Sequence, residues 1–449
     1  MAPSAVIVGA GVGGLSMGAL LARDGYAVTI FEKDERVGGR TASTTYKNHT
    51  LDNGFHIMPF YKKSALYDVL SMTGIRDSTG LAPVSDIAFY SKDRFHRYPA
   101  GILDILRMSL VPFKSRVILL RILLPMAFST MSSAEKKDNV SLSSVTTSMD
   151  NRTRAFFDAV CMLAFADTPD RVSLGEFIRT IIRANPFRGG TSRFAYPTKG
   201  YDTICKVLAS YVKSRGGRIL LSSPIQKIEV RQDSVYGVTD SNGDITRTNC
   251  VIATPPAYQI PRLLDDNILN TSTKRHIEGL KSSTAVIEVH YATNRQIDTR
   301  QIVFPVGDYT AKGIFFTSNI SAQLCPAGEH QLICGAPIDP ANMTGSKLRQ
   351  TAIRMRHDIE SIYPGFQDSI IWERPQAWSL VESVAKMPGM VWRSKMPHYA
   401  SEVNGLFFVG DSTISYGIGT DSAAHSALLC YPHVKAHISG VAPVISPQG

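Results

Sequence analysis

The stretch that decides the fold is Ala5-Val-Ile-Val-Gly-Ala-Gly-Val-Gly-Gly14, close to the N-terminus. Four apolar residues lead directly into a run of glycines that contains the pattern G-x-G-x-x-G. Residues 15–24 then have helical periodicity, and residues 27–31 form a second apolar run. A buried strand, a glycine-rich turn, a helix and a second strand make a βαβ unit, which predicts a parallel sheet.

The glycines of this pattern each have a physical task. Gly9 permits the tight turn, Gly11 lets the backbone approach a pyrophosphate, and Gly14 lets helix and strand pack closely. The start of the helix offers unpaired N–H groups and a positive partial charge to the phosphates. Glu32 stands at the end of the second strand, where an acidic side chain accepts hydrogen bonds from a ribose diol. The pattern therefore predicts that the protein binds a dinucleotide.

The composition is that of an ordinary globular protein, with 44% hydrophobic and 19% charged residues among 449. It excludes disorder, collagen and coiled coil as the main architecture. The net charge of +10 suits an anionic partner such as a membrane surface or a phosphate-rich cofactor. The charges are dispersed and no base-reading motif is present, so we expect no nucleic-acid partner. The six cysteines form no C-x-x-C pair, so we expect free thiols in a reducing compartment and no metal site.

Two further segments carry a resemblance to a known family. Arg36-Val-Gly-Gly-Arg40 follows Glu32, and Gly405-Leu-Phe-Phe-Val-Gly-Asp411 stands near the C-terminus. With the N-terminal glycines, they resemble the fingerprints of the superfamily of flavin-containing amine oxidases, protoporphyrinogen oxidases and phytoene desaturases, and most of all phytoene desaturase-like oxidoreductases. The resemblance implies FAD as the cofactor. The residues that it implies at the FAD site are Gly9, Gly11, Gly13, Gly14, Glu32, Lys33, Gly38, Gly39, Arg40, Gly410, Asp411, Gly419 and Thr420.

Weaker similarities lie between these two ends. Ser222-Ser-Pro-Ile-Gln-Lys-Ile228 resembles a strand of the family whose aliphatic residue, here Ile225, packs near the adenine. Cys250-Val-Ile-Ala-Thr-Pro-Pro256 resembles the strand that re-enters the dinucleotide domain. The resemblance implies an α/β protein with a Rossmann-like FAD-binding domain built from discontinuous segments, 1–85, 190–260 and 400–449. Residues 86–189 and 261–399 would form a substrate domain with a mixed β-sheet and a helical cap.

Catalytic residues are harder to assign. His56, in a segment that resembles one beside the flavin, is either a polar group near the isoalloxazine or a hydrogen-bonded structural histidine. In Tyr196-Pro-Thr-Lys-Gly200, Lys199 replaces a glycine that is usual in desaturases. Lys199 either points a cation toward the active site or is an exposed loop residue. Many amine oxidases carry a lysine that holds water near the flavin, but we interpret Lys386 as a surface or turn lysine.

The chain changes character at about 101–131, where aliphatic runs are interrupted by Arg107, Lys114, Arg116 and Arg121. No run reaches the ~18 uncharged apolar residues needed to span a bilayer. Aliphatic residues interleaved with cations are typical of a helix in the membrane interface, which predicts a membrane-facing cap. A buried cap whose arginines face water is the alternative. We expect Ser129–Ser148, which follows, to be a surface connection.

The resemblance implies an FAD-dependent oxidoreductase. The expected reaction is hydride transfer at flavin N5 with a hydrophobic, isoprenoid or carotenoid-like substrate, in desaturation, saturation or isomerisation. Orientation in a hydrophobic tunnel would then count for more than a general base. The alternatives are an amine or porphyrinogen oxidase that uses oxygen, and a non-enzymatic prenyl-binding escort-like protein. We expect a cytoplasmic protein, peripheral to the membrane. The sequence does not specify its oligomeric state.

Overall fold

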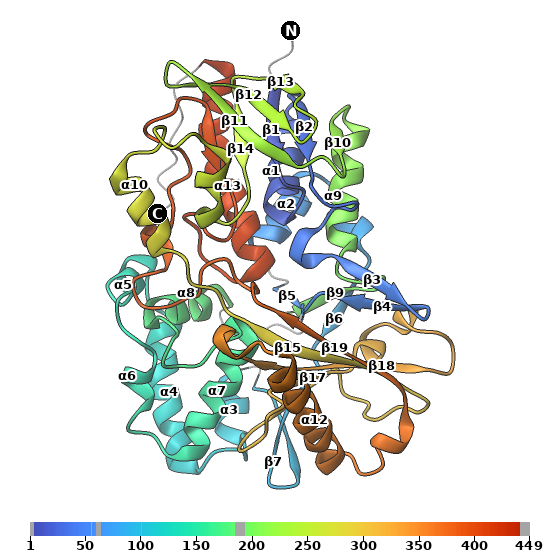
Figure 1. The fold of residues 1–449 in the computed structure, drawn as a ribbon. Helices are drawn as coiled ribbons and strands as arrows, with labels where there is room; N and C mark the ends of the chain where they lie inside the picture. Colours follow the sequence, from blue (N-terminus) through green and yellow to red (C-terminus); the bar gives the residue numbers. More distant parts are fainter. Residues whose placement is uncertain (1–3, 55, 60–63, 100, 185–193, 441–449) are drawn as a thin grey trace.

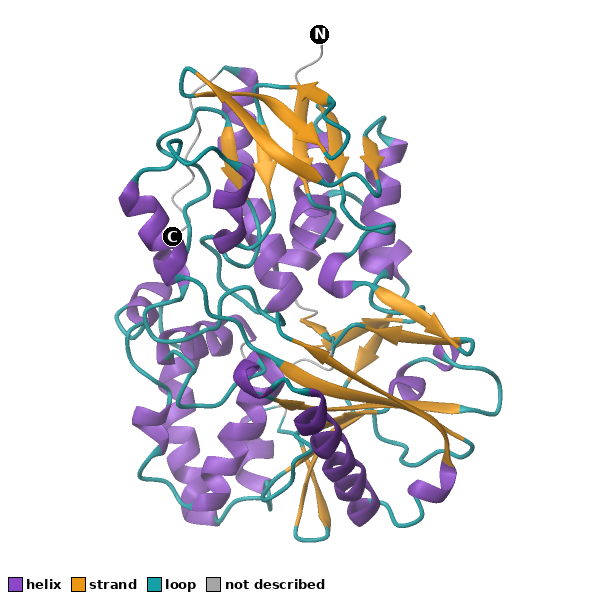
Figure 2. Cartoon of the chain, viewed as in Figure 1, coloured by secondary structure: helices purple, strands orange, loops and turns teal. Residues whose placement is uncertain are grey.

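The computed structural model describes residues 4–54, 56–59, 64–99, 101–184 and 194–440 (Figure 1). The parts of the predicted FAD-binding domain at 190–193 and 441–449 lie outside these residues. The remaining chain forms two regions, one around a parallel sheet and one around a larger mixed sheet with helices beside it (Figure 2).

The N-terminal strands lie in a five-stranded parallel sheet. Its order is β10 (Arg218–Leu220), β2 (Ala27–Phe31), β1 (Ser4–Val8), β14 (Val251–Ala253) and β20 (Leu406–Phe408). Neighbouring strands all pair in parallel. The predicted βαβ unit and the Rossmann-like sheet built from distant segments are therefore confirmed.

Helices α1 (Val12–Arg23), α9 (Thr203–Ser214) and α13 (Gly419–Ser439) pack together against this sheet. α1 is buried from Val12 to Ala22, because its apolar and small residues face the sheet on one side and helices on the other. α1 follows β1, and α13 follows β20 through a short loop. The carboxyl ends of parallel strands meet at one edge, so both helices begin beside the same edge of the sheet.

A seven-stranded sheet forms the second region. Its order is β19 (Ile370–Trp378), β15 (Val286–Thr293), β18 (His330–Pro337), β17 (Gly313–Phe315), β16 (Ile302–Pro305), β7 (Ile87–Ser91) and β8 (Arg94–Arg97). β16 and β7 pair in parallel and the other neighbours are antiparallel, which confirms the predicted mixed sheet. α12 (Gly345–Ile362) packs on one face through Met355, Ile359 and Ile362.

Smaller elements complete these two regions. A three-stranded antiparallel sheet holds β11 (Ile225–Arg231), β12 (Ser234–Asp240) and β13 (Ile245–Arg247), and is followed by α10 (Thr271–Gly279). β3 (Ser43–Tyr46) pairs with β4 (His49–Asp52), and β9 (Phe194–Pro197) lies between β5 (Met58–Pro59) and β6 (Leu81–Val84). α2 (Ala65–Met72) contacts α13, and α11 (Thr317–Ile320) contacts β18. The boundaries of the two predicted domains remain a prediction.

The helical cap lies beside the mixed sheet (Figure 1). It consists of α3 (Ile102–Arg107), α4 (Phe113–Ala127), α5 (Met131–Glu135), α6 (Ser143–Thr146), α7 (Asn151–Phe165) and α8 (Leu174–Ala184). Ser129–Ser148, expected to be a surface connection, contains the short helices α5 and α6, and most of its residues are exposed or half-buried. Its Asp138 is buried and lies 2.6 Å from the guanidinium of Arg179. In the described part of the chain, no helix combines the length and hydropathy needed to cross a bilayer.

Candidate cofactor and active site

In the glycine-rich turn after β1, a side chain would collide with protein atoms at two of the glycines and would meet none at a third. Gly9 has φ +108°, and a Cβ there would stand 2.3 Å from Oγ1 of Thr254. A Cβ at Gly14 would stand 2.1 Å from the carbonyl oxygen of Gly9. At Gly11, by contrast, a Cβ would meet nothing within 4 Å. The backbone at Gly11 therefore leaves space for a ligand to approach, as a pyrophosphate requires.

Glu32 holds this turn against the end of β2. Its buried carboxylate accepts hydrogen bonds from the backbone N–H of Ala10, at 2.7 Å, and of Asp34, at 3.0 Å. Lys33 is exposed and lies 3.3 Å from Asp34. The acidic residue thus has a structural role in the turn besides the predicted contact with a ribose.

The glycines at 38 and 39 form the turn that follows. The N–H of Gly38 donates to the carbonyl of Ala10 at 2.9 Å, which brings this turn beside the first one. Gly38 has φ +119° and Gly39 has φ +55°, conformations that favour glycine. Ile225, at the start of β11, packs on the apolar cluster that includes Phe31. These segments therefore gather around the end of β2.

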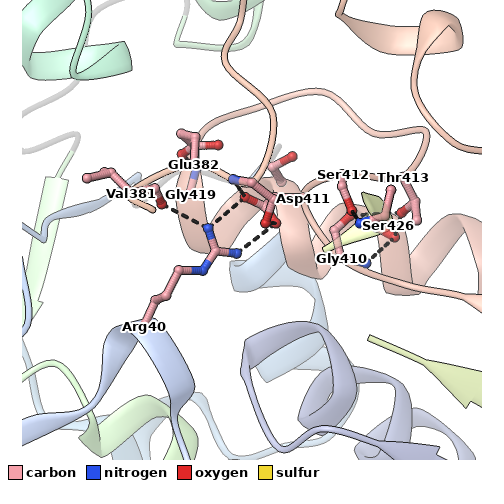
Figure 3. A network of polar contacts seen from close by, with 12 residues as sticks. Arg40, Val381, Glu382, Gly410, Asp411, Ser412, Thr413, Gly419 and Ser426 are labelled. Atoms are coloured by element: carbon pink, nitrogen blue, oxygen red, sulfur yellow. Dashed lines mark hydrogen bonds and ion pairs between the residues drawn. The ribbon is translucent and has the colours of Figure 1, made fainter. Parts of the chain in front are cut away.

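Arg40 and Asp411 join this turn to the C-terminal segment (Figure 3). The guanidinium donates to both carboxylate oxygens, at 2.7 and 3.0 Å, and to the carbonyl of Val381 at 2.9 Å. Ser383 donates to the same carboxylate from its N–H, at 2.7 Å, and its hydroxyl, at 2.6 Å. Burial alone raises the pKa of Asp411, but the charge of Arg40 and these hydrogen bonds outweigh it. The pKa of Asp411 therefore lies below its ordinary value.

The start of α13 is bound by carboxylates. The N–H of Gly417 donates to Glu176 at 3.0 Å, and the N–H of Gly419 donates to Glu382 at 2.7 Å. The hydroxyl of Thr420 lies 3.0 Å from that of Tyr201. Carboxylates at a helix N-terminus bind its N–H donors and interact favourably with its positive partial charge. The N–H groups of Gly417 and Gly419 are therefore taken by protein carboxylates, and the features of this end that suit an anionic ligand are the open turn at Gly11 and the cation of Arg40.

A cavity of about 790 Å³ begins at these turns. One end is lined by Gly11, Gly13, Gly38, Arg40, Gly410, Asp411, Gly419 and Thr420. The remaining wall is largely apolar and includes Ile57, Val84, Ile87, Val160, Leu163, Phe165, Phe177, Ile181, Phe194, Phe304 and Phe315. The cavity thus joins a polar end made of helix starts and glycine turns to an apolar chamber between the mixed sheet and the cap.

The residues at the polar end fit FAD. The open backbone at Gly11, the starts of α1 and α13 and the cation of Arg40 face one end of the same cavity. These features would hold the pyrophosphate and the polar edge of the flavin, while FAD would supply hydride chemistry. Among the described residues, no three His, Cys, Asp or Glu side chains are grouped so that they could hold a metal ion.

The two predicted catalytic residues lie in different places. His56 lines the cavity, and its ring stacks on that of Tyr201, with centroids 4.6 Å apart and planes at 19°. One ring nitrogen lies 3.0 Å from the carbonyl of Asn53, and burial lowers the pKa of His56. Lys199 is exposed in the turn after β9 and is not among the residues that line the cavity. Its placement therefore does not support a cation from this residue in the active site.

The interpretation of Lys386 as a surface lysine is wrong. Its side chain is buried, and its Nζ lies 3.2 Å from a carboxylate oxygen of Glu382. Burial alone lowers the pKa of Lys386, but the charge of Glu382 outweighs it and leaves this pKa above its ordinary value. Lys386 is not among the residues that line the cavity; Glu382 is. The lysine therefore acts on the site through Glu382.

Other functional side chains were missed by the sequence analysis. Lys395 is buried and donates to the carbonyl of Asp411 at 2.9 Å and to the hydroxyl of Ser415 at 2.8 Å. Burial holds the pKa of Lys395 well below its ordinary value. Glu288, on β15, is fully buried and lines the cavity. The signal for Glu288 in the sequence is a charged residue inside a strand that is buried along its whole length.

Comparisons with known proteins agree with the flavin cofactor expected from the sequence. The model of the family described as flavin containing amine oxidoreductase matches residues 12–430. A 15-cis-phytoene desaturase of Solanum lycopersicum is 23% identical over 454 residues, which cover 95% of this chain and 76% of that protein. The match to the family bears out the predicted resemblance and the flavin cofactor.

Solved structures share the architecture. An oxidoreductase from Methanosarcina mazei superimposes with a TM-score of 0.76 at 19% identity, over 95% of this chain and 99% of that one. An engineered putrescine oxidase superimposes with a TM-score of 0.73 at 15% identity, over 96% of this chain and 98% of that one. At these identities the likeness shows the fold, and it confirms the predicted α/β fold class.

Proposed function

Because the chain belongs to the flavin containing amine oxidoreductase family, we propose that this FAD-dependent oxidoreductase acts on a hydrophobic, isoprenoid- or carotenoid-like substrate. The reaction would be a desaturation, a saturation or an isomerisation. The observation that carries the proposal is the apolar chamber of the 790 Å³ cavity, which continues directly from the cofactor end. An apolar chain in that chamber would be held next to the flavin and away from water.

This chain's own residues would supply binding and orientation. Phe304 and Phe315 on the mixed sheet and Phe165 and Phe177 in the cap line the chamber from two sides. Aromatic and aliphatic walls bind an apolar chain through its buried surface, at roughly 25 cal/mol per Å². A bound chain has few polar groups to fix its position, so the shape of the chamber would select which carbon atoms reach the flavin.

We also propose that the cap contacts an anionic membrane surface from the cytoplasmic side. The side chains of Leu103, Phe113 and Phe128 are 63%, 66% and 65% exposed, although they are large and apolar. Lys114 and Arg121 on α4, the helix that begins at Phe113, are exposed too, and cations beside apolar groups favour anionic lipid.

The position of the cavity supports the same proposal. Arg97, Tyr98 and Pro99 line it and stand directly before α3 in the chain. The substrate would pass from the bilayer into the chamber at this end. The six cysteines are all free thiols, five of them buried, which suits a reducing compartment such as the cytoplasm.

A second candidate is an oxidase of an amine or a porphyrinogen, with oxygen as the acceptor. Two carboxylates that line the cavity, Glu288 and Glu382, favour it, because a buried carboxylate attracts a cationic amine. A prenyl-binding escort role is disfavoured by the complete set of glycines, Glu32 and Asp411 at the cofactor end. Peroxide formation during turnover would support the oxidase.

The experiment that tests the proposal is product analysis. The FAD-loaded protein is mixed without oxygen with liposomes that contain an acyclic isoprenoid, and the products are measured by mass spectrometry. Loss of two hydrogens indicates desaturation, a gain indicates saturation, and an unchanged mass with altered geometry indicates isomerisation. Turnover of amines or porphyrinogens, but of no isoprenoid, would contradict the proposal.

A further inference from the structure

Glu288 lines the cavity on β15, a strand that begins close to residues bonded to the cofactor end. Arg40 donates to the carbonyl of Val381, and the N–H of Val381 donates to the carbonyl of Thr284 at 2.9 Å. These two bonds connect the cofactor end to the residues just before β15. Val286 and Glu288, two residues apart on one face of that strand, both line the cavity. The strand therefore carries a carboxylate from the cofactor end toward the chamber.

The carboxylate of Glu288 is held in place. Its Oε2 accepts a hydrogen bond from the indole N–H of Trp378 at 3.0 Å. Trp378 comes from β19, the neighbouring strand, which pairs with β15 along its length. The other oxygen, Oε1, lies 3.6 Å from the place that a Cβ would take at Gly54, and Nε2 of His56 lies 3.2 Å from the same place. Glu288 and His56 thus share one wall of the cavity.

Among the described residues, four other charged groups line the cavity. These are Arg40, Arg97, Glu382 and Asp411. Arg40 and Asp411 bind each other, and Glu382 accepts from Gly419 and pairs with Lys386. Arg97 is exposed. Glu288 is a fully buried carboxylate that lines this cavity, on the same wall as the imidazole of His56.

We propose that Glu288 is a catalytic residue that accepts a proton from the substrate; this inference rests on the proposed function, in its desaturation form. One C–H bond of the substrate breaks, and its hydrogen leaves as hydride to oxidised FAD. The C–H bond on the neighbouring carbon also breaks, and its proton passes to the carboxylate of Glu288. The electron pair of that second bond forms the new C=C bond. The substrate thus loses two protons and two electrons: the hydride carries one proton and both electrons, and Glu288 takes the other proton and later returns it to solvent.

This assignment changes one expectation from the sequence. From the sequence alone, we expect orientation to count for more than a general base. A buried carboxylate beside the reacting end of the cavity gives the second C–H bond a proton acceptor, and positioned acid–base groups contribute typically 10²- to 10⁴-fold to a rate. Orientation by the apolar wall and proton transfer to Glu288 would act together.

The test compares Glu288→Gln with wild type and with Glu373→Gln. Glu373 is an exposed residue of β19 that pairs with Arg356 at 3.0 Å, so its replacement removes the same charge from the same sheet outside the cavity. We expect all three proteins to bind FAD and isoprenoid with similar affinity, the latter measured by quenching of flavin fluorescence. Anaerobic bleaching of the flavin by isoprenoid should be about 100-fold slower in Glu288→Gln and unchanged in Glu373→Gln.

Infrared difference spectroscopy gives a second readout. A protonated-carboxyl band should appear as the flavin is bleached in wild type and in Glu373→Gln, and should be missing in Glu288→Gln. If Glu288→Gln does not fold, Trp378→Phe serves instead. It keeps the carboxylate but removes its hydrogen bond, so the band should shift and bleaching should slow several-fold. An unchanged band and rate in Trp378→Phe would overturn the inference.

The outcomes separate this inference from the proposed function. Bleaching by isoprenoid at similar rates in wild type and Glu288→Gln would overturn the role of Glu288 and leave the function standing. A change confined to the affinity for an amine would also overturn it, because Glu288 would then bind a cation. If isoprenoid does not bleach even the wild-type flavin, both fail.

Discussion

The guanidinium of Arg40 and the carboxylate of Asp411 form a two-point ion pair, at 2.7 and 3.0 Å, between residues 371 positions apart in the chain (Figure 3). It connects the loop after β2 to the loop after β20 at the polar end of the cavity. Bidentate pairs of this kind are directional as well as strong. The pair therefore fixes the distance between the two halves of the cofactor site.

Replacement of Arg40 by methionine should weaken both folding and FAD binding. Asp411 would remain buried beside Ser383 without its cation, which we expect to cost about 1–3 kcal/mol of unfolding free energy, since Arg40 itself is partly exposed. Thermal unfolding and FAD titration measure the two effects. Arg36→Met, in the same loop, is the control, because Arg36 bonds only a backbone carbonyl, that of Ser43. Equal FAD affinity in both variants would contradict the role given to Arg40.

The same pair predicts a pH dependence. The pKa of Asp411 is lower in the folded protein than in the unfolded chain, where an aspartate has a pKa of about 3.9. The stabilisation is therefore complete above about pH 4 and is lost as the pH falls further. The difference in stability between wild type and Arg40→Met should shrink below about pH 4. Denaturant unfolding at several pH values would show this, and a constant difference would contradict it.

The glycine turn offers a variant that separates folding from cofactor binding. Gly11 has φ −76°, which alanine adopts freely, and a Cβ there meets no protein atom. We expect Gly11→Ala to keep its unfolding free energy within about 0.5 kcal/mol and to lose FAD affinity at least tenfold. Gly14→Ala should destabilise the fold itself, because its Cβ meets the carbonyl of Gly9. Full FAD affinity in Gly11→Ala would show that the pyrophosphate does not approach this position.

Two buried histidines should make the protein sensitive to mild acid. Burial lowers the pKa of His290 to about 3 and that of His398 to about 4, against about 6.5 in an unfolded chain. The unfolded chain takes up these protons first, so stability should fall as the pH decreases from 6.5 toward 4. Replacing either residue by glutamine should reduce this loss by on the order of 2 kcal/mol. His357→Gln, at an exposed site on α12, should leave the dependence of stability on pH unchanged. If it reduces the loss of stability as much as the other two replacements do, the loss does not come from the buried histidines.

The membrane proposal makes a prediction for the cap. Phe113→Glu combined with Phe128→Glu removes the two most exposed large apolar groups near α4 and adds negative charge. The variant should lose most of its flotation with liposomes that contain anionic lipid, while its FAD content stays the same. Ile353→Glu, at an exposed apolar site on α12, is the matched control and should float like wild type. Undiminished flotation of the Phe113 and Phe128 variant would rule out this surface.

The turns of the cofactor end could be predicted from the sequence because they are encoded locally. Any side chain at Gly9 or Gly14 would collide with Thr254 or with the backbone. The spacing of these glycines in the sequence therefore predicts the shape of the turn. Glu32 and Asp411 follow buried strands at fixed positions. These features need no knowledge of distant contacts.

The rest of the site depends on partners that meet only in the folded chain. Lys386 pairs with Glu382, four residues before it, but the burial of this pair depends on a distant contact, because Glu382 accepts from the N–H of Gly419 at the start of α13. Lys395 is buried against Asp411 and Ser415 for the same reason. Glu288 reaches the cavity because the mixed sheet turns one face of β15 toward it. Lys199, chosen for its departure from a family pattern, lies in an exposed turn.

The most direct test of the whole account is the visible spectrum of the purified, FAD-reconstituted protein before and after anaerobic addition of isoprenoids, porphyrinogens and amines. We predict a flavin spectrum that is bleached by an isoprenoid and not by the other two classes. Bleaching by amines or porphyrinogens alone would contradict the proposed substrate, and a protein that binds no FAD would contradict the assignment of the cavity.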